Sequence, residues 1–344
     1  MSKSKFALIG SSKFSNHVTP PGHPERIERA EVMDTVARHW VEAGQELIVP
    51  RLASENELKA VHTDDYVKSI ASTAGRTVGL DPDTYTSPDS YEVARLAAGA
   101  AIMAVGHTLD NDGSALALVR PPGHHAERDR AMGFCLFNSV AVAAASALAR
   151  GLSRVAIIDY DVHHGNGTQW MFYDDPRVLY VSTHQSPFYP GTGKTDDVGQ
   201  NQGEGFTFNV PLAAGANDAD YDLVFRSLIT PVLRSFNPEL LIVSAGYDAH
   251  ERDPLAGMRV TTQGYAAMTR HLLAVAAECC QGRLAAVVEG GYDLQALTAC
   301  LESTIQILDQ APSGQIQTFE GVTERADAVI DSIRRVQRPY WSTL

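Results

Sequence analysis

Apolar and polar positions alternate along this chain in two rhythms. Short apolar runs are separated by longer stretches in which apolar residues recur every three or four positions. The short runs predict buried strands and the longer stretches predict amphipathic helices. We expect strands at 6–10, 115–119, 155–159, 178–182, 206–210, 240–245 and 284–289, and helices at 24–43, 91–109, 138–149, 218–236, 262–280, 294–308 and 322–336.

The order of these elements predicts the fold class. Strands alternate with helices, and most strands are apolar on both faces, which is typical of a mostly parallel sheet covered by helices on both sides. No internal repeat, low-complexity tract or long linker interrupts the sequence. We therefore expect a single α/β domain that spans residues 1–344.

Composition narrows the cellular setting. The net charge is −13 and no block of Lys or Arg offsets it, which argues against a nucleic-acid partner. No apolar run approaches the ~18 residues of a membrane helix, and the first residues lack a signal peptide's long apolar region. Four cysteines without zinc-site spacing predict buried thiols in a reducing compartment: Cys135, Cys279, Cys280 and Cys300. We expect a cytoplasmic protein with no membrane partner.

The segment 157–167, IIDYDVHHGNG, combines a buried strand with polar groups that a strand does not need. Asp159, Asp161 and His163 alternate, so an extended chain places all three side chains on one face. Each would be costly to bury unless it were paired or bound to a cation. The segment therefore predicts a metal site where this strand ends.

Three other expected strands are also followed by chemically active residues. The segment 120–125 follows the second strand, Asp248 follows the sixth, and 290–292 follows the seventh. Taken alone, each fits a simpler role, such as loop histidines, a helix N-cap at Asp248 or a covering side chain at Tyr292. Ligand sites of open α/β sheets lie at the carboxyl ends of the strands, so the conjunction favours one shared site.

These segments resemble the zinc-dependent histone deacetylase and acetylpolyamine amidohydrolase superfamily. The motifs run in order: HPERIERA (23–30), RPPGHHAE (120–127), GFCLFN (133–138), DYDVHHGNG (159–167), VSTH (181–184), FYPGTG (188–193), SAGYDAHERDPLAG (244–257) and EGGYD (289–293). The resemblance implies the three-layer arginase/deacetylase fold, with a central, mostly parallel sheet flanked by helices on both faces. The HPER start, Asn166 and the DPLAG loop resemble class II members.

The resemblance implies that Asp161, His163 and Asp248 hold Zn²⁺. Two carboxylates and an imidazole leave open positions for water and the acetyl oxygen, and the hard oxygen donors leave Fe²⁺ open as well. The resemblance also implies a K⁺ site that is formed, largely through backbone oxygens, by Asp159, Asp161, His163, Ser182 and Thr183.

The catalytic roles also come from the resemblance. His125 matches the general base and acid, and His124 matches a neighbour that assists electrostatically. Asp159 is expected to orient His124, and Asn166 stands behind His125 where class I members have an aspartate. Because an amide stabilises imidazolium less than a carboxylate does, we expect His125 to be less basic than in class I. Tyr292 matches the tyrosine that stabilises the oxyanion.

The substrate slot is the third part of the resemblance. Its expected residues are Gly133, Phe134, Tyr189, Leu255 and Gly291. The two aromatic rings would flank an acetylated aliphatic chain, and the carbonyl of Gly133 would accept the scissile amide N–H. Leu255 stands where polyamine-specific members carry a glutamate, which favours acetyl-lysine over a cationic polyamine. Arg29 matches an arginine near an internal channel for acetate, and a helix-surface arginine is the alternative.

The leading hypothesis is a metal-dependent enzyme that deacetylates N-acetyl-lysine in a peptide or protein. A first alternative is an acetylpolyamine amidohydrolase, or a deacylase of another small acylated amine. A second is a non-catalytic acetyl-lysine binding module, which the retained ligands, histidines and Tyr292 disfavour. Arginase-like hydrolysis would need further metal-binding aspartates, which the sequence lacks. The resemblance leaves a homo-oligomer open.

Overall fold

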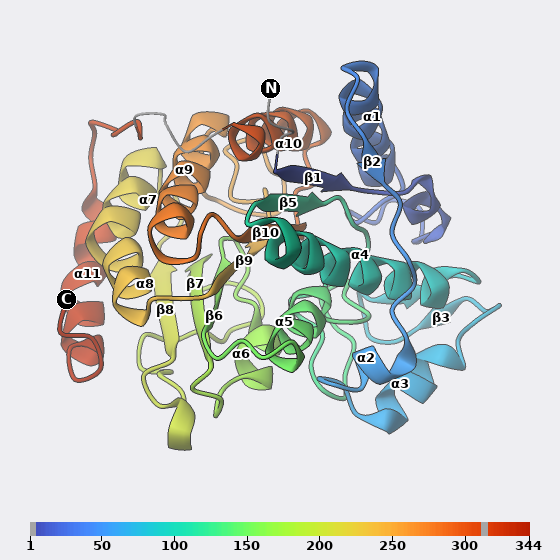
Figure 1. Cartoon of the computed structure of the whole chain (residues 1–344), viewed down its shortest axis with the longest axis horizontal. Coiled ribbons are helices and arrows are strands. Elements are labelled where there is room, and N and C mark those ends of the chain that lie inside the picture. Colours follow the sequence, from blue (N-terminus) through green and yellow to red (C-terminus); the bar gives the residue numbers. More distant parts are fainter. Residues whose placement is uncertain (1–4, 311–315) are drawn as a thin grey trace.

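The computed structural model describes residues 5–310 and 316–344. Its centre is one eight-stranded sheet (Figure 1). The strands lie in the order β2-β1-β5-β10-β9-β6-β7-β8, and all neighbours are parallel. Their bounds are β1 Phe6–Ile9, β2 Leu47–Ile48, β5 Ser114–Ala117, β6 Val155–Asp159, β7 Val178–Gln185, β8 Thr207–Leu212, β9 Leu240–Ala245 and β10 Leu284–Val288. A separate antiparallel pair is formed by β3 Val78–Gly79 and β4 Tyr85–Thr86.

Helices cover both faces of the sheet (Figure 1). On one face α4 and α5 pack over strand residues such as Ala115 and Ile157. On the other face α1 and α7 to α11 pack over Leu116 and Ile158. Because successive strand residues point to opposite faces, each strand contributes to both cores. The predicted three-layer α/β arrangement is confirmed. The helices of these two layers are α1 Glu28–Glu42, α4 Ser90–Asn111, α5 Ser139–Ala149, α7 Asp218–Val224, α8 Thr230–Phe236, α9 Thr262–Cys279, α10 Leu294–Asp309 and α11 Glu324–Gln337.

All seven predicted strands form, and the differences from the prediction have physical causes. β7 continues to Gln185 instead of ending at 182, because its polar residues are buried within the sheet rather than exposed in a loop. The helix predicted at 218–236 is interrupted by a π-helical turn, Phe225–Ile229. Pro231 follows this turn and has no backbone N–H to donate, which accounts for the wider turn before it.

Several short elements lie outside the prediction. They are α2 Glu55–Leu58, α3 Asp64–Ala71, α6 Asn166–Met171, β2 and the β3–β4 pair. Each is shorter than the window of residues in which a helical or strand period can be recognised. The predicted start of the first helix at 24 is wrong, since α1 begins at Glu28. The buried carboxylate of Glu25 instead pairs with Arg120 in the loop after β5.

The structure also tests two expectations from composition, on membrane helices and on the cysteines. No helix within the described ranges is long and apolar enough to cross a membrane. The four cysteines are free, and Cys135, Cys280 and Cys300 are buried as predicted. Cys279 is partly exposed at the end of α9, so the prediction of a buried thiol is wrong at this position.

The strand order determines where the chemistry gathers. β5, β10, β9 and β6 are consecutive neighbours, and their carboxyl ends lie at one edge because the strands are parallel. The register pairs Asp159 at the end of β6 with Ser244 of β9 on one side and with Ser182 of β7 on the other. The four loops that carry the predicted site residues therefore leave adjacent strands at the same edge.

We expect Gly99→Ala to destabilise the protein. A Cβ at Gly99, on α4, would lie 1.8 Å from the backbone carbonyl oxygen of Arg51. Overpacking of this kind costs about 1–3 kcal/mol, so the thermal midpoint should fall. Gly106→Ala on the same helix is the control, because its Cβ would meet only the Arg150 side chain at 3.8 Å. The control should raise stability by up to about 1 kcal/mol. An unchanged midpoint for Gly99→Ala would contradict this account.

Candidate active site

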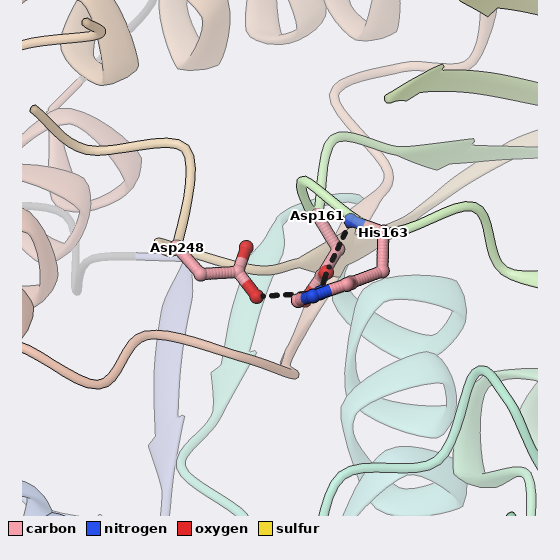
Figure 2. A group of neighbouring side chains, drawn as sticks. All are labelled: Asp161, His163 and Asp248. Carbon is pink, nitrogen blue, oxygen red and sulfur yellow. Dashed lines mark hydrogen bonds and ion pairs between the residues drawn. The ribbon is translucent and has the colours of Figure 1, made fainter. Parts of the chain in front are cut away.

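Asp161, His163 and Asp248 converge at the edge of the sheet (Figure 2). The Nδ1 atom of His163 lies 3.0 Å from Oδ1 of Asp161 and 3.1 Å from Oδ2 of Asp248. The ligand atoms of the three residues all lie within 4.8 Å of one another; the two aspartates are fully buried, and His163 is 8% exposed. The structure thus brings together the three residues that the sequence predicted as metal ligands.

Backbone groups fix the two carboxylates. Oδ2 of Asp161 accepts a hydrogen bond from the N–H of Gly290 at 2.8 Å, and Oδ1 of Asp248 accepts one from Val162 at 2.8 Å. Space is equally restricted, because a Cβ at Gly246 or at Gly290 would lie 2.1 Å from a carboxylate oxygen of this pair. Glycine at 246 and 290 is therefore required by the close approach of the chain to the acidic residues.

The electrostatics of this cluster fit a divalent cation. Burial and the negative charge of Asp161 raise the pKa of Asp248. Burial opposes a charge on His163, yet the two carboxylates raise its pKa above the usual value. Two buried carboxylates beside one imidazole repel each other, and a bound cation would stabilise them. Ligand atoms ~2.1 Å from one ion at tetrahedral angles lie about 3.4 Å apart, close to the spacings here.

The tandem histidines occupy different electrostatic environments. Nδ1 of His124 lies 3.0 Å from Oδ2 of Asp159. Burial opposes a charge on His124, but Asp159 and Asp161 raise its pKa well above the usual value. Nδ1 of His125 lies 2.8 Å from Oδ1 of Asn166. Burial and the neighbouring His124 lower the pKa of His125 well below its usual value. His124 is thus suited to carry a positive charge, and His125 to remain a neutral proton acceptor.

Tyr292 completes the site from the loop after β10. Burial raises the pKa of its phenol well above the usual value, so the group remains a hydrogen-bond donor. The guanidinium of Arg29 lies 5.0 Å from the centre of the Tyr292 ring and donates to the carbonyl of Gly291 at 2.8 Å. Arg29 is fully buried, so the helix-surface alternative is wrong. Its proximity to an acetate channel stays a prediction.

The predicted slot residues lie around the histidines. The ring of Tyr189 lies 5.2 Å from that of His125, and the ring of Phe134 lies 5.9 Å from that of Tyr292. Gly133 touches His125 directly, because a Cβ there would lie 2.3 Å from the imidazole ring. A cavity of about 550 Å³ in front of Tyr292 is lined by residues 19–24, 26–28, Pro254 and Leu255. Leu255 and Tyr292 therefore line the same cavity.

Ser182 and Thr183, predicted to contribute to a K⁺ site, are both buried in β7. Ser182 is the register partner of Asp159, and its hydroxyl lies 2.9 Å from Nδ1 of His184. The Thr183 hydroxyl has no hydrogen-bond partner among the residues that the structure describes. The predicted K⁺-binding residues therefore lie on the adjacent strands β6 and β7 and on the loop that follows β6.

Two buried carboxylates organise the site without having been predicted. Asp253 accepts from the backbone N–H of Tyr292 at 2.6 Å and from that of Leu255 at 3.0 Å. Glu289 accepts from the N–H groups of Gly123 and His124, at 2.6 Å and 3.2 Å. Both residues lie within motifs already noted, DPLAG and EGGYD, but these partners are backbone groups; Glu289 accepts one further hydrogen bond, from the Ser244 hydroxyl at 3.2 Å. Such contacts leave no signal in the pattern of side chains.

Known proteins resemble this chain in sequence over most of its length. A sequence profile described as the histone deacetylase domain matches residues 23–308. A probable deacetylase of Archaeoglobus fulgidus is 40% identical over 292 residues, which cover 84% of this chain and 81% of the relative. The human polyamine deacetylase HDAC10 is 40% identical over 340 residues, which cover 93% of this chain and 49% of that protein.

A solved structure extends the similarity to the fold. The structure titled "Crystal Structure of HDA15 HD domain" superposes with a TM-score of 0.91 at 35% identity, covering 100% of this chain and 96% of that chain. The profile match spans most of the described sheet, from the segment before α1 to α10. The chain therefore belongs to the histone deacetylase family.

Proposed function

We propose that this protein is a metal-dependent deacetylase that hydrolyses the acetyl amide of N-acetyl-lysine in a peptide or protein. The observation that carries the proposal is the convergence of a buried Asp-His-Asp cluster, two tandem histidines in unlike environments and a buried tyrosine. These groups supply a cation site, a proton acceptor and an oxyanion donor, which are the parts that amide hydrolysis requires.

Asp161, His163 and Asp248 would hold the divalent ion, which when bound polarises the acetyl carbonyl and acidifies a water molecule. His125 donates from Nδ1 to Asn166, so its Nε2 is free to take the proton of the attacking water. The same nitrogen later delivers that proton to the leaving amine. The phenolic O–H of Tyr292 donates a hydrogen bond to the developing oxyanion.

His124 assists without moving a proton. Its bond to Asp159 favours the charged imidazolium, whose ring centre lies 4.0 Å from that of His125. That charge stabilises the negative charge that develops on the substrate oxygen. It also disfavours a lasting second positive charge on His125, so the proton taken from water is readily passed on.

The identity of the cations is part of the proposal. The imidazole ligand favours Zn²⁺ as the catalytic ion, and the two carboxylates are also compatible with Fe²⁺. A K⁺ ion beneath the site would be held by oxygens of Asp159, Asp161, His163, Ser182 and Thr183. The pairing of β6 with β7 and the unpartnered Thr183 hydroxyl, among the described residues, support this site.

Leu255 favours a lysine side chain over a polyamine. Its apolar side chain borders the cavity at Tyr292, so no carboxylate at this position can pair with a second ammonium group of the substrate. Burying that ammonium without a partner would be costly. The name of the human relative makes polyamine deacetylation the rival function.

We also propose that the protein is class II-like and that it is located in the cytoplasm.

Removing the metal should abolish activity reversibly. We expect a chelator to eliminate turnover of an acetyl-lysine peptide and Zn²⁺ or Fe²⁺ to restore it, with the faster ion identifying the preferred metal. Asp248→Asn should lose most of its bound divalent metal, measured by elemental analysis, because one charged ligand is removed. Asp331→Asn, at an exposed position of α11, is the matched control. Full activity in metal-free protein would exclude the mechanism.

Tyr292→Phe should reduce kcat by about 100- to 1,000-fold, because it removes one oxyanion donor. The metal content and thermal midpoint should stay close to wild type, since the aromatic ring is kept. Tyr340→Phe is a control outside the site, where the phenol contacts Glu204. A kcat within about threefold of wild type for Tyr292→Phe would show that the tyrosine has no such role.

Leu255→Glu should shift substrate preference toward acetylated polyamines. We expect the ratio of kcat/KM for an acetylated polyamine to that for an acetyl-lysine peptide to rise at least about tenfold, through pairing with the second ammonium. Leu255→Gln has a similar shape without the charge, and should change this ratio far less. Equal effects of the two substitutions would contradict a charge-based gate.

A further inference from the structure

The side-chain amide of Asn166 is engaged at both ends. Oδ1 lies 2.8 Å from Nδ1 of His125, and Nδ2 donates to Oε1 of Glu127 at 2.7 Å. An ionised carboxylate can only accept hydrogen bonds, so the NH₂ end of the amide must face Glu127. The carbonyl end must therefore face His125. Nδ2 also lies 3.5 Å from the carbonyl oxygen of His125 and 3.4 Å from Sδ of Met132, so Glu127 is its shortest contact and its one charged partner among the described residues.

The amide orientation in turn determines where His125 carries its hydrogen. An amide oxygen opposite Nδ1 requires the hydrogen to be on Nδ1, which leaves the Nε2 lone pair free. If the amide were reversed, its NH₂ group would face Nδ1 and favour the hydrogen on Nε2. That tautomer cannot accept a proton at Nε2, and a histidine in the wrong tautomer is a poor base.

Glu127 is itself held by local contacts. Its backbone N–H donates to the carbonyl of Arg130 at 2.9 Å, and Nη2 of Arg130 donates to Oε1 at 2.9 Å. Its carbonyl lies 2.9 Å from Nδ1 of His62, whose Nε2 accepts from the N–H of Asn138 at 3.0 Å. The Glu127 side chain is 20% exposed, so water screens its charge only in part. The carboxylate therefore has a defined position beside Asn166.

The same contact makes a carboxylate at position 166 unfavourable. An aspartate there would place one of its oxygens where Nδ2 now lies, 2.7 Å from Oε1 of Glu127. Two carboxylates at this distance repel each other, and the guanidinium of Arg130 on Oε1 offsets this repulsion only in part, because its side chain is 60% exposed. Glu127 and an amide donor at 166 are thus a matched pair.

We propose that Glu127 is a positioning residue that orients the Asn166 amide, and through it selects the Nδ1–H tautomer of His125. The catalytic consequence rests on the proposed role of His125 as the base, whereas the tautomer itself does not. The pair should also be exchangeable, because a glutamine at 127 can donate to an aspartate at 166.

The exchange is tested by steady-state kinetics of the Zn²⁺-loaded protein on an acetyl-lysine peptide. We expect Asn166→Asp to reduce kcat at least about tenfold with little change in KM. The double variant Glu127→Gln/Asn166→Asp should recover to within about threefold of wild type, because the hydrogen bond is restored with donor and acceptor exchanged. Glu278→Ala, which removes a surface partner of Arg234, is the control. Additive losses in the double variant would overturn the matched pair.

The tautomer is tested independently by long-range ¹H–¹⁵N NMR of the histidine-labelled, Zn²⁺-loaded protein, with the His125 signals assigned from a His125→Ala spectrum. Wild type should show the Nδ1–H form, and Glu127→Ala should show a mixture or the Nε2–H form. An unchanged Nδ1–H form in Glu127→Ala overturns the inference. A changed tautomer with unchanged turnover would support the positioning by Glu127 and refute the proposed base.

Discussion

The site depends on keeping two buried carboxylates, Asp161 and Asp248, close to the same imidazole. Like charges in a poorly solvated environment repel strongly, so the fold must supply positive charge and hydrogen-bond donors around them. The donors are the backbone N–H groups of Gly290 and Val162, and the ligand atoms lie within 4.8 Å of one another, as a shared cation would require. Glycines at 246 and 290 follow from the same requirement, since no side chain fits beside the carboxylates.

Further carboxylates connect the loops that carry the reacting groups. Glu289, after β10, binds the backbone before the tandem histidines, and Asp253 binds the backbone of Tyr292. Glu127 binds the amide behind His125. Hydrogen bonds to an ionised acceptor are stronger than neutral ones, and they restrict loops that would otherwise move independently. Each reacting group is therefore placed by a contact from a different strand's loop, which is how a preorganised site is built.

The sequence was sufficient for seven of the eight strands of the sheet and for the edge at which the site lies, but not for the strand order. Parallel strands buried on both faces are uniformly apolar, and their carboxyl ends share one edge. The clusters after β5, β6, β9 and β10 meet because these four strands are neighbours in the observed order. The end of β7 was misplaced because Thr183, His184 and Gln185 look like loop residues, although they are buried strand residues. Polar residues near the site therefore made the end of this strand difficult to predict from the sequence.

The residues that sequence reasoning missed share one property. Asp253 and Glu289 act on backbone N–H groups, whose chemical nature is the same at almost every residue. Neither periodicity nor motif spacing reports a partner of that kind, so only coordinates reveal it. The contact from Asp253 also explains how selectivity and chemistry can vary separately at Leu255. The backbone N–H of Leu255 is held by the carboxylate that also holds Tyr292, whereas its side chain borders the cavity. A substitution at 255 can therefore alter the charge that lines the cavity while Tyr292, the proposed oxyanion donor, keeps its position.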